Sequence, residues 1–201
     1  MKEHIKQKFG EKEIEEIYTK IKTTIMIRLY DKLFPKKPSL EDITFYNQCL
    51  KLSWIEPKHL KQANLFFDNF LPITTSYFEQ MNNEKCGLGK LEIIYKIFDA
   101  INNVILFNKG GNYSTDEIAP ILEFAMIKAQ PTRFPSNLKY LQIFMKKDPN
   151  QKERMYFDFL KGSMDIIKNA NYLNFYDVTE EEFNRKYKEM KDRLEKEFEI
   201  D

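Results

Sequence analysis

Residues 91–107 read LEIIYKIFDAINNVILF, and this stretch decides the fold. Drawn as an α-helix, it carries apolar side chains on nearly every side, and a helix of that kind is normally buried. Two consecutive glycines, Gly110 and Gly111, end it. We therefore predict a central helix that other helices surround.

The segments before this helix have the spacing of amphipathic helices. Apolar residues recur every three or four positions over residues 11–34, and Pro35 and Pro38 stop that helix. Ser39 with Asp42 resembles a capping box that starts a second helix. The stripe of the first helix holds Ile14, Ile17, Tyr18, Ile21, Ile25, Leu29, Tyr30 and Leu33, and the expected inner face of the second holds Ile43, Tyr46, Cys49, Leu50 and Trp54.

Two prolines mark the elements that come next. Pro57 suits the first turn of a third helix, and Pro72 is a break or a restart point within a helical stripe over residues 65–81. Residues 82–89 include two glycines and are the best candidate for an internal boundary. The stripe holds Leu65, Phe66, Phe70, Ile73, Tyr77, Phe78 and Met81.

The second half of the chain also predicts helices. One runs to about Gln130, and Ser136 is a suitable N-cap for another that runs to about Met145. Thr179 with Glu182 forms a second capping box, which opens the last helix. The stripes of the final two helices hold Met155, Phe159, Gly162, Ile166 and Ile167, and Phe183, Tyr187, Met190, Leu194 and Phe198.

The composition favours helices and excludes nucleic acid as a charge-driven partner. Only 6 Gly and 8 Pro among 201 residues leave little room for the tight turns of a β-sandwich or barrel. We therefore predict an all-α fold of about eight or nine helices. The 32 basic and 31 acidic residues give a net charge of +1, so the basic excess of a nucleic-acid binder is missing.

Few residues offer catalytic or metal-binding chemistry. His4 and His59 are the only histidines, and no cluster has zinc-site spacing. Cys49 and Cys86 make no disulfide framework, which favours a reduced, cytoplasmic setting, and we interpret Cys86 as an inert thiol. Phosphate-loop and nucleophile-elbow motifs are missing too, so we expect no metal and no cofactor. The longest charge-free stretch, residues 101–108, is far shorter than the roughly 20 residues of a membrane span.

Three motifs in the second half resemble one family. They read STDEIAPIL at residues 114–122, IKAQP at residues 127–131 and SNLKYL at residues 136–141. Together they are similar to the vacuolar protein sorting nine (Vps-nine) domain, which shows an acidic pair before a proline, then Ile-Lys-Ala-Asn-Pro-Pro, then Ser-Asn-x-x-Tyr. Matching segments elsewhere extend the resemblance over residues 14–187; they read IMIRLY at 25–30, LSWIEP at 52–57, IFDAI at 97–101 and EEFNR at 181–185.

The resemblance implies a division of the chain. Residues 1–81 would be an N-terminal helical bundle like the one in Rabex-like proteins, and residues 82–176 would be an all-helical exchange domain. Residues 177–201 would be a C-terminal helix docked on the bundle, or less favourably a helix that covers the functional groove.

The family implies guanine nucleotide exchange on a Rab-five-type endosomal GTPase. Asp116, four residues before Pro120, would be an aspartate finger that enters the nucleotide site of the GTPase. Its carboxylate would offer the phosphate-binding lysine a substitute partner and would disfavour the magnesium ion and the terminal phosphates. The protein would then act without covalent chemistry, at early endosomes, as a monomer that reaches the membrane only by peripheral recruitment.

Asp116 has a simpler interpretation as well. If Ser114 is an N-cap and Glu117 completes a capping box, Asp116 lies in the first turn of a helix, where carboxylates are favoured anyway. Pro120 conflicts with that start because it would deprive the Asp116 carbonyl of its amide partner. A helix that begins at Pro120 instead leaves Asp116 on a projecting loop, and this conflict favours the finger.

The rest of the family's binding surface is a groove between the helix near Asp116 and the helix near Tyr156. The predicted contacts to the GTPase are Pro120, Lys128, Asn137, Tyr140, Met155, Tyr156 and Asp158. For Asn137 and Tyr140, a helix-start hydrogen bond and core packing are the alternative. Met155 and Asp158 stand where the family usually has Tyr and Thr, and Tyr156 is about 100° away on a helix. These departures favour, as a second hypothesis, a module that binds a GTPase with little exchange; a helical scaffold is the third.

Overall fold

The computed structural model describes residues 10–60, 69–109, 115–145 and 150–198 of the chain. Within these ranges the fold is all-α, with eight α-helices and three short 3-10 helices, as predicted. The α-helices are α2 (Glu11–Leu33), α3 (Leu40–Lys51), α4 (Phe70–Asn83), α5 (Gly87–Lys109), α6 (Ile118–Ala129), α7 (Phe134–Phe144), α8 (Gln151–Lys168) and α9 (Glu180–Phe198). The 3-10 helices are η1 (Pro57–His59), η2 (Thr115–Glu117) and η3 (Tyr172–Asn174).

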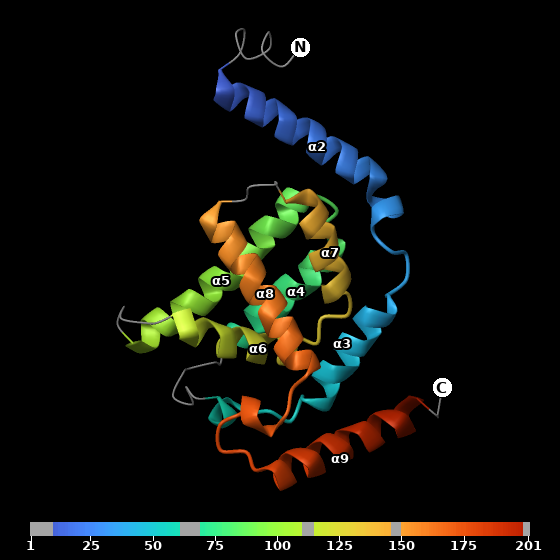
Figure 1. Ribbon diagram of the computed structural model, residues 1–201, viewed down its shortest axis with the longest axis vertical. Helices are drawn as coiled ribbons and strands as arrows, with labels where there is room; N and C mark the ends of the chain where they lie inside the picture. Colours follow the sequence, from blue (N-terminus) through green and yellow to red (C-terminus); the bar gives the residue numbers. More distant parts are fainter. Residues whose placement is uncertain (1–9, 61–68, 110–114, 146–149, 199–201) are drawn as a thin grey trace.

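The predicted central helix, α5, lies among α4, α6 and α7. Its buried side chains occur on several sides because almost every turn is apolar; they are Ile93, Ile94, Ile97, Phe98, Ile101 and Ile105. Figure 1 shows α2 across one end of the molecule and α9 across the other, with α4 to α8 between them. The amino-terminal and carboxyl-terminal helices therefore lie at opposite ends.

A buried carboxylate joins α3 to the start of α7. Ser39 caps α3 through the backbone N–H of Asp42, as the capping box predicts. The Asp42 side chain also reaches α7, where it accepts hydrogen bonds from the Ser136 backbone N–H at 2.9 Å and from the Ser136 hydroxyl at 2.5 Å. Ser136 was expected at the N-cap, but the N-cap is Arg133, three residues earlier, and Ser136 lies in the first turn of α7. Asp42 therefore satisfies the first turn of α7 from another helix.

Several predicted inner faces are wrong in detail. In α3 the buried side chains include Phe45 and the predicted Cys49, whereas Ile43 is exposed. In α8 the predicted Ile167 is buried, but the other buried apolar side chains are Tyr156, Leu160 and Met164, which lie outside the predicted stripe. In α2 most of the predicted stripe is exposed. The buried apolar side chains of this helix are Tyr30, which was predicted, and Met26, which was not. The predicted Leu65 and Phe66 lie outside the described residues, as do Gly110 and Gly111.

The last helix, α9, packs on α3. Thr179 accepts a hydrogen bond from the backbone N–H of Glu182, as the predicted capping box requires. Phe183 packs against Trp54, and the Tyr187 hydroxyl lies 2.7 Å from Oε1 of Gln48 on α3. The division at residue 81 remains a prediction; it falls inside α4, which packs on α5 and α6.

Candidate functional site

A groove of about 490 Å³ lies between the amino-terminal end of α6 and one face of α8. Its apolar walls come from Met155, Phe159, Gly162 and Ile166, with Ala119 on the α6 side. These four α8 positions follow a spacing of four, three and four residues, so they share one face of the helix. Four of the five residues of the stripe predicted for the core therefore form the wall of the groove, and the fifth, Ile167, is buried.

Polar side chains line the same groove. They are Gln151, Arg154, Asp158 and Ser163, of which the sequence pointed only to Asp158. Ser163 is 2% exposed, and its hydroxyl has no hydrogen-bond partner among the described residues. A buried hydroxyl without a partner costs free energy, so Ser163 is a point of local instability behind the groove wall.

An N-cap and core packing fix the position of α8 beside the groove. Asn150 caps it by accepting a hydrogen bond from the Glu153 backbone N–H at 2.8 Å. About 100° around the helix from Met155, Tyr156 is 3% exposed and stacks on Phe98 with the ring centroids 3.8 Å apart. The predicted contact of Tyr156 with a partner is therefore wrong, because the one-residue offset turns its ring into the core.

Asp116 lies in η2, directly before α6, and its side chain is exposed. Ala119, which lines the groove, is three residues away, so the two Cα atoms are no more than about 11 Å apart. The helix begins at Ile118, and Pro120 occupies its third position. A proline there costs no helical hydrogen bond, because the first-turn amides have no partner in the helix. The conflict over Pro120 is thereby resolved with Asp116 before the helix; Ser114 lies outside the described residues.

The support behind Asp116 is rigid. Most of α6 is buried, including Ile121, Leu122, Ala125 and Met126, and the helix packs on both α4 and α8. A carboxylate just before a helix also lies in the favourable field of the helix N-terminus. The exposed acid is thus positioned by a core element and not by a long loop.

Asn137 and Tyr140 lie in the core, away from the groove. Each is 1% exposed. Oδ1 of Asn137 accepts a hydrogen bond at 2.6 Å from Nζ of Lys90, a fully buried lysine on α5, and Tyr140 donates to the Lys85 carbonyl at 2.9 Å. Neither side chain can touch a partner in this conformation, so the predicted contacts of Asn137 and Tyr140 are corrected to structural roles.

Lys90 is the centre of this buried cluster, and the sequence analysis missed it. Its ammonium group also donates to the Met81 carbonyl at 2.5 Å and lies 5.1 to 5.7 Å from the ring centroids of Tyr30, Phe34 and Tyr140. Burial lowers the pKa of Lys90 to about 8, because the charged form loses its water. The cluster joins α2 to α5 and α7.

Pro120 and Lys128 face another side of α6. Pro120 lines a small hollow of about 280 Å³ together with Glu123 and residues 173–176, in and just after η3. Nζ of Lys128 donates to the Ser53 carbonyl at 2.7 Å, at the end of α3. Burial raises the pKa of Glu123 to about 7, which no feature of the sequence pattern indicated. Neither Pro120 nor Lys128 lines the groove.

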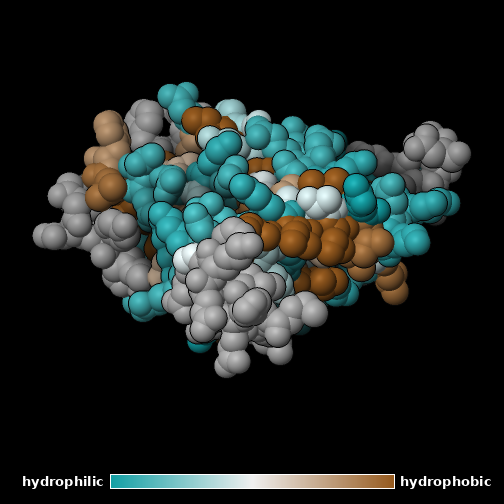
Figure 2. Space-filling model, turned by 90° about the horizontal axis from the view of Figure 1, so that it is seen from above, coloured by the Kyte–Doolittle hydropathy of each residue, from teal (hydrophilic) through white to brown (hydrophobic). Residues whose placement is uncertain are grey.

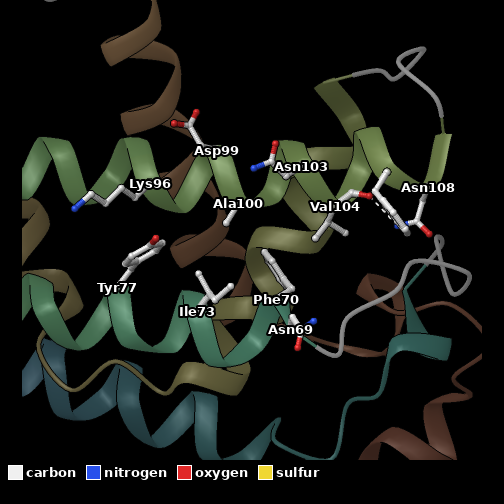
Figure 3. A pocket seen from close by; sticks show the side chains of 11 residues that line it. Asn69, Phe70, Ile73, Tyr77, Lys96, Asp99, Ala100, Asn103, Val104 and Asn108 are labelled. Atoms are coloured by element: carbon white, nitrogen blue, oxygen red, sulfur yellow. Dashed lines mark hydrogen bonds between the residues drawn. The ribbon is translucent and has the colours of Figure 1, made fainter.

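A larger hollow, of about 840 Å³, lies between α4 and α5 (Figure 3). Ile73 and Tyr77 of α4 face Ala100 and Val104 of α5 across it, and the polar Asp99 lies at its rim. It shares no lining residue with the groove and contains none of the residues predicted to bind a partner. The groove is therefore the stronger candidate.

The described part of the chain has neither a metal-binding cluster nor a membrane-spanning helix. No three His, Cys, Asp or Glu side chains gather there in a way that could hold a metal ion. Over the same residues, every helix is too short or too polar to serve as a membrane span.

The comparison with protein families decides the relationship. A family model for the vacuolar sorting protein 9 (VPS9) domain matches residues 71–171, half of the chain. The chain belongs to the VPS9 domain family. The matched residues extend from α4 to the end of α8 and include both walls of the groove.

Individual relatives agree with this assignment. The Rab5 GDP/GTP exchange factor of Bos taurus is 27% identical over 86% of this chain and 37% of its own length. The vacuolar protein sorting-associated protein 9A of Oryza sativa subsp. japonica is 24% identical over 74% of this chain and 32% of its own length. The Schizosaccharomyces pombe protein vps901 is 34% identical over 44% of the chain. The VPS9 chain described here spans just over a third of the length of the first of these relatives.

Proposed function

We propose that this VPS9 chain promotes the release of GDP from a Rab-family GTPase, with Asp116 as the residue that disturbs the nucleotide site. One observation carries the proposal: an exposed carboxylate lies directly before α6, three residues from Ala119, which lines an apolar groove. Relatives named Rab5 GDP/GTP exchange factor favour a Rab5-type partner and an endosomal site of action.

The proposed mechanism needs only binding energy. Groove residues Met155, Phe159 and Ile166 would hold an apolar surface of the GTPase, and Asp116 would enter the site where the phosphates bind. Its carboxylate would pair with the phosphate-binding lysine and repel the anionic nucleotide. By linkage, a factor that binds the empty GTPase more tightly weakens nucleotide binding by the same ratio.

The direct test uses GTPases loaded with fluorescent GDP, including a Rab5-type protein. The wild-type chain should accelerate release, and Asp116→Ala should slow the accelerated rate by about 10-fold to 100-fold, because a charge-assisted hydrogen bond contributes about 1.5–3 kcal/mol. Asp116→Asn keeps the shape and removes the charge, so it should lose most of the effect too.

Asp158→Asn is the matched control, since it removes a carboxylate from the groove wall and leaves Asp116 intact. It should change the rate much less than Asp116→Ala does. Equal release by wild type and Asp116→Ala would contradict the proposal, and so would no acceleration with any member of the GTPase panel.

A second candidate is a module that binds the GTPase with little exchange. It is favoured by Met155 and Asp158, which line the groove at positions where the family usually has Tyr and Thr. This candidate predicts capture of a GTPase without faster release. The double change Met155→Tyr and Asp158→Thr should then raise the release rate, whereas it should leave an already efficient exchange factor little changed.

A further inference from the structure

The most apolar face of α2 is turned away from the rest of the protein. Tyr18 is 64% exposed and Ile21 is 54% exposed, and Ile17 and Ile25 are exposed to a similar degree. Together with the half-buried Ile14, these side chains form one stripe at a spacing of three and four residues. Figure 2 looks down on this end of the molecule and shows a brown band along it. A contiguous apolar patch of this kind marks an interaction surface.

A different face of α2 packs on the body of the protein. Met26 and Tyr30 are buried there with Phe34, Tyr140 and Phe144. Ile25 and Met26 are neighbours in sequence, and one residue is a turn of about 100° on a helix. The helix is therefore already anchored through one face while the stripe remains free for another molecule.

The charges on α2 indicate what could cover the stripe. The helix has five basic and five acidic residues, so it carries no net charge to attract an anionic lipid surface. The charges are separated along the chain: residues 11–16 hold four glutamates and one lysine, and residues 28–37 hold four basic residues and one aspartate. Two α2 helices packed antiparallel would bring each acidic end beside the basic end of the other copy.

We propose that α2 pairs with α2 of a second copy of this chain, antiparallel, around a two-fold axis near Ile21. In such a pair each contact occurs twice, so Ile17 meets Ile25 of the second copy and Ile14 comes beside Arg28. Glu13, on the flank of the stripe, then lies near Arg28 of the second copy. This proposal replaces the expectation of a monomer, and it is independent of the exchange proposal because no α2 residue lines the groove.

The first test is the mass of the full chain in solution by analytical ultracentrifugation over a wide range of micromolar concentrations. The wild type should change from monomer to dimer within this range. Ile21→Lys places two positive charges at the axis and should weaken the dimer by at least 10-fold. Phe107→Lys removes a side chain that is 84% exposed on α5, and it should leave the dimer intact. Equal thermal unfolding of both variants would show that the fold is kept.

Cysteine cross-linking tests the orientation in a Cys86→Ser background. Ile21→Cys should form a disulfide-linked dimer on oxidation. Ile14→Cys alone should not, because in the antiparallel pair the two copies of residue 14 are about 21 Å apart along the helices. A mixture of Ile14→Cys with Arg28→Cys should cross-link.

Three results would overturn the proposal. The first is a monomer at every concentration, and the second is a dimer that Ile21→Lys does not weaken. The third is cross-linking of Ile14→Cys with itself, which indicates a parallel pair. Co-sedimentation of a monomeric wild type with anionic vesicles, lost in Ile21→Lys, would assign the stripe to lipid instead.

Discussion

Two groups of residues within the VPS9 match have opposite environments. Asp116, Met155 and Asp158 are exposed or line the groove, whereas Asn137 and Tyr140 surround the buried ammonium group of Lys90. A motif does not distinguish the two groups, because a residue that holds a helix pair and a residue that touches a partner can recur equally in a family. Burial distinguishes them: the first group should determine activity and the second stability.

The sharpest way to break this contrast is to remove the Asn137 side chain. Asn137→Ala deprives Lys90 Nζ of its Asn137 acceptor, which leaves the Met81 carbonyl, and removes the hydrogen bond from Asn137 Nδ2 to Asn82 Oδ1 at 2.8 Å. We expect a loss of about 3 kcal/mol in the free energy of unfolding, measured by urea denaturation. Exchange per folded molecule should stay unchanged. A stable variant that lacks exchange would reverse the assignment.

The pH dependence of stability should report on Lys90. Its pKa is about 8 when folded and 10.5 in the reference state, so above pH 8 the unfolded chain binds more protons than the native one. Stability should therefore rise with pH between about pH 8 and pH 9.5 by up to about 2 kcal/mol from this group, and the gain is absent below pH 8. Urea denaturation of the wild type and of Lys90→Met, each at about pH 8 and about pH 9.5, isolates the contribution of Lys90 to the free energy of unfolding. An identical pH dependence in the two proteins would contradict the assignment.

Substitution of two glycines tests the same contrast between buried and groove residues by adding a side chain. A Cβ on Gly87 would overlap the ring of Phe144, which belongs to the buried cluster of α2 and α7. Gly87→Ala should therefore lower the melting temperature and cost about 1–2 kcal/mol. The exchange rate of the folded protein should not change; a neutral effect on stability would show that Phe144 moves aside freely.

Gly162 gives the smallest effect, with the opposite sign. A Cβ there meets nothing within 4 Å, and the residue lies inside α8. Gly162→Ala should stabilise the protein by about 0.5–1 kcal/mol in thermal or urea unfolding. Gly162→Leu should keep that stability and narrow the groove, so GTPase binding measured by calorimetry should weaken. Unchanged binding by the leucine variant would argue against the groove as the contact surface.

The elements were predictable because their ends depend on local chemistry. Prolines and capping boxes such as Ser39 with Asp42 locate helix ends without knowledge of the tertiary fold. Which face of each helix is buried was harder to predict, because periodicity shows that an apolar stripe exists and does not show what covers it. The Met155 stripe lines the groove and the Ile21 stripe faces solvent, although both have the pattern of a core. Lys90 was missed because a lysine is ordinarily exposed, and only the fold brings three rings around it.

The carboxylate of Asp42 has a consequence for anyone who shortens this protein. The family match starts at residue 71, yet the first turn of α7 donates a hydrogen bond to the Asp42 carboxylate of α3. Two of the aromatic rings around the Lys90 ammonium group, those of Tyr30 and Phe34, also lie before the match. A fragment cut at the edge of the match would carry the whole groove and lack these supports. The segment that matches the family is thus shorter than the segment that the domain needs in order to fold.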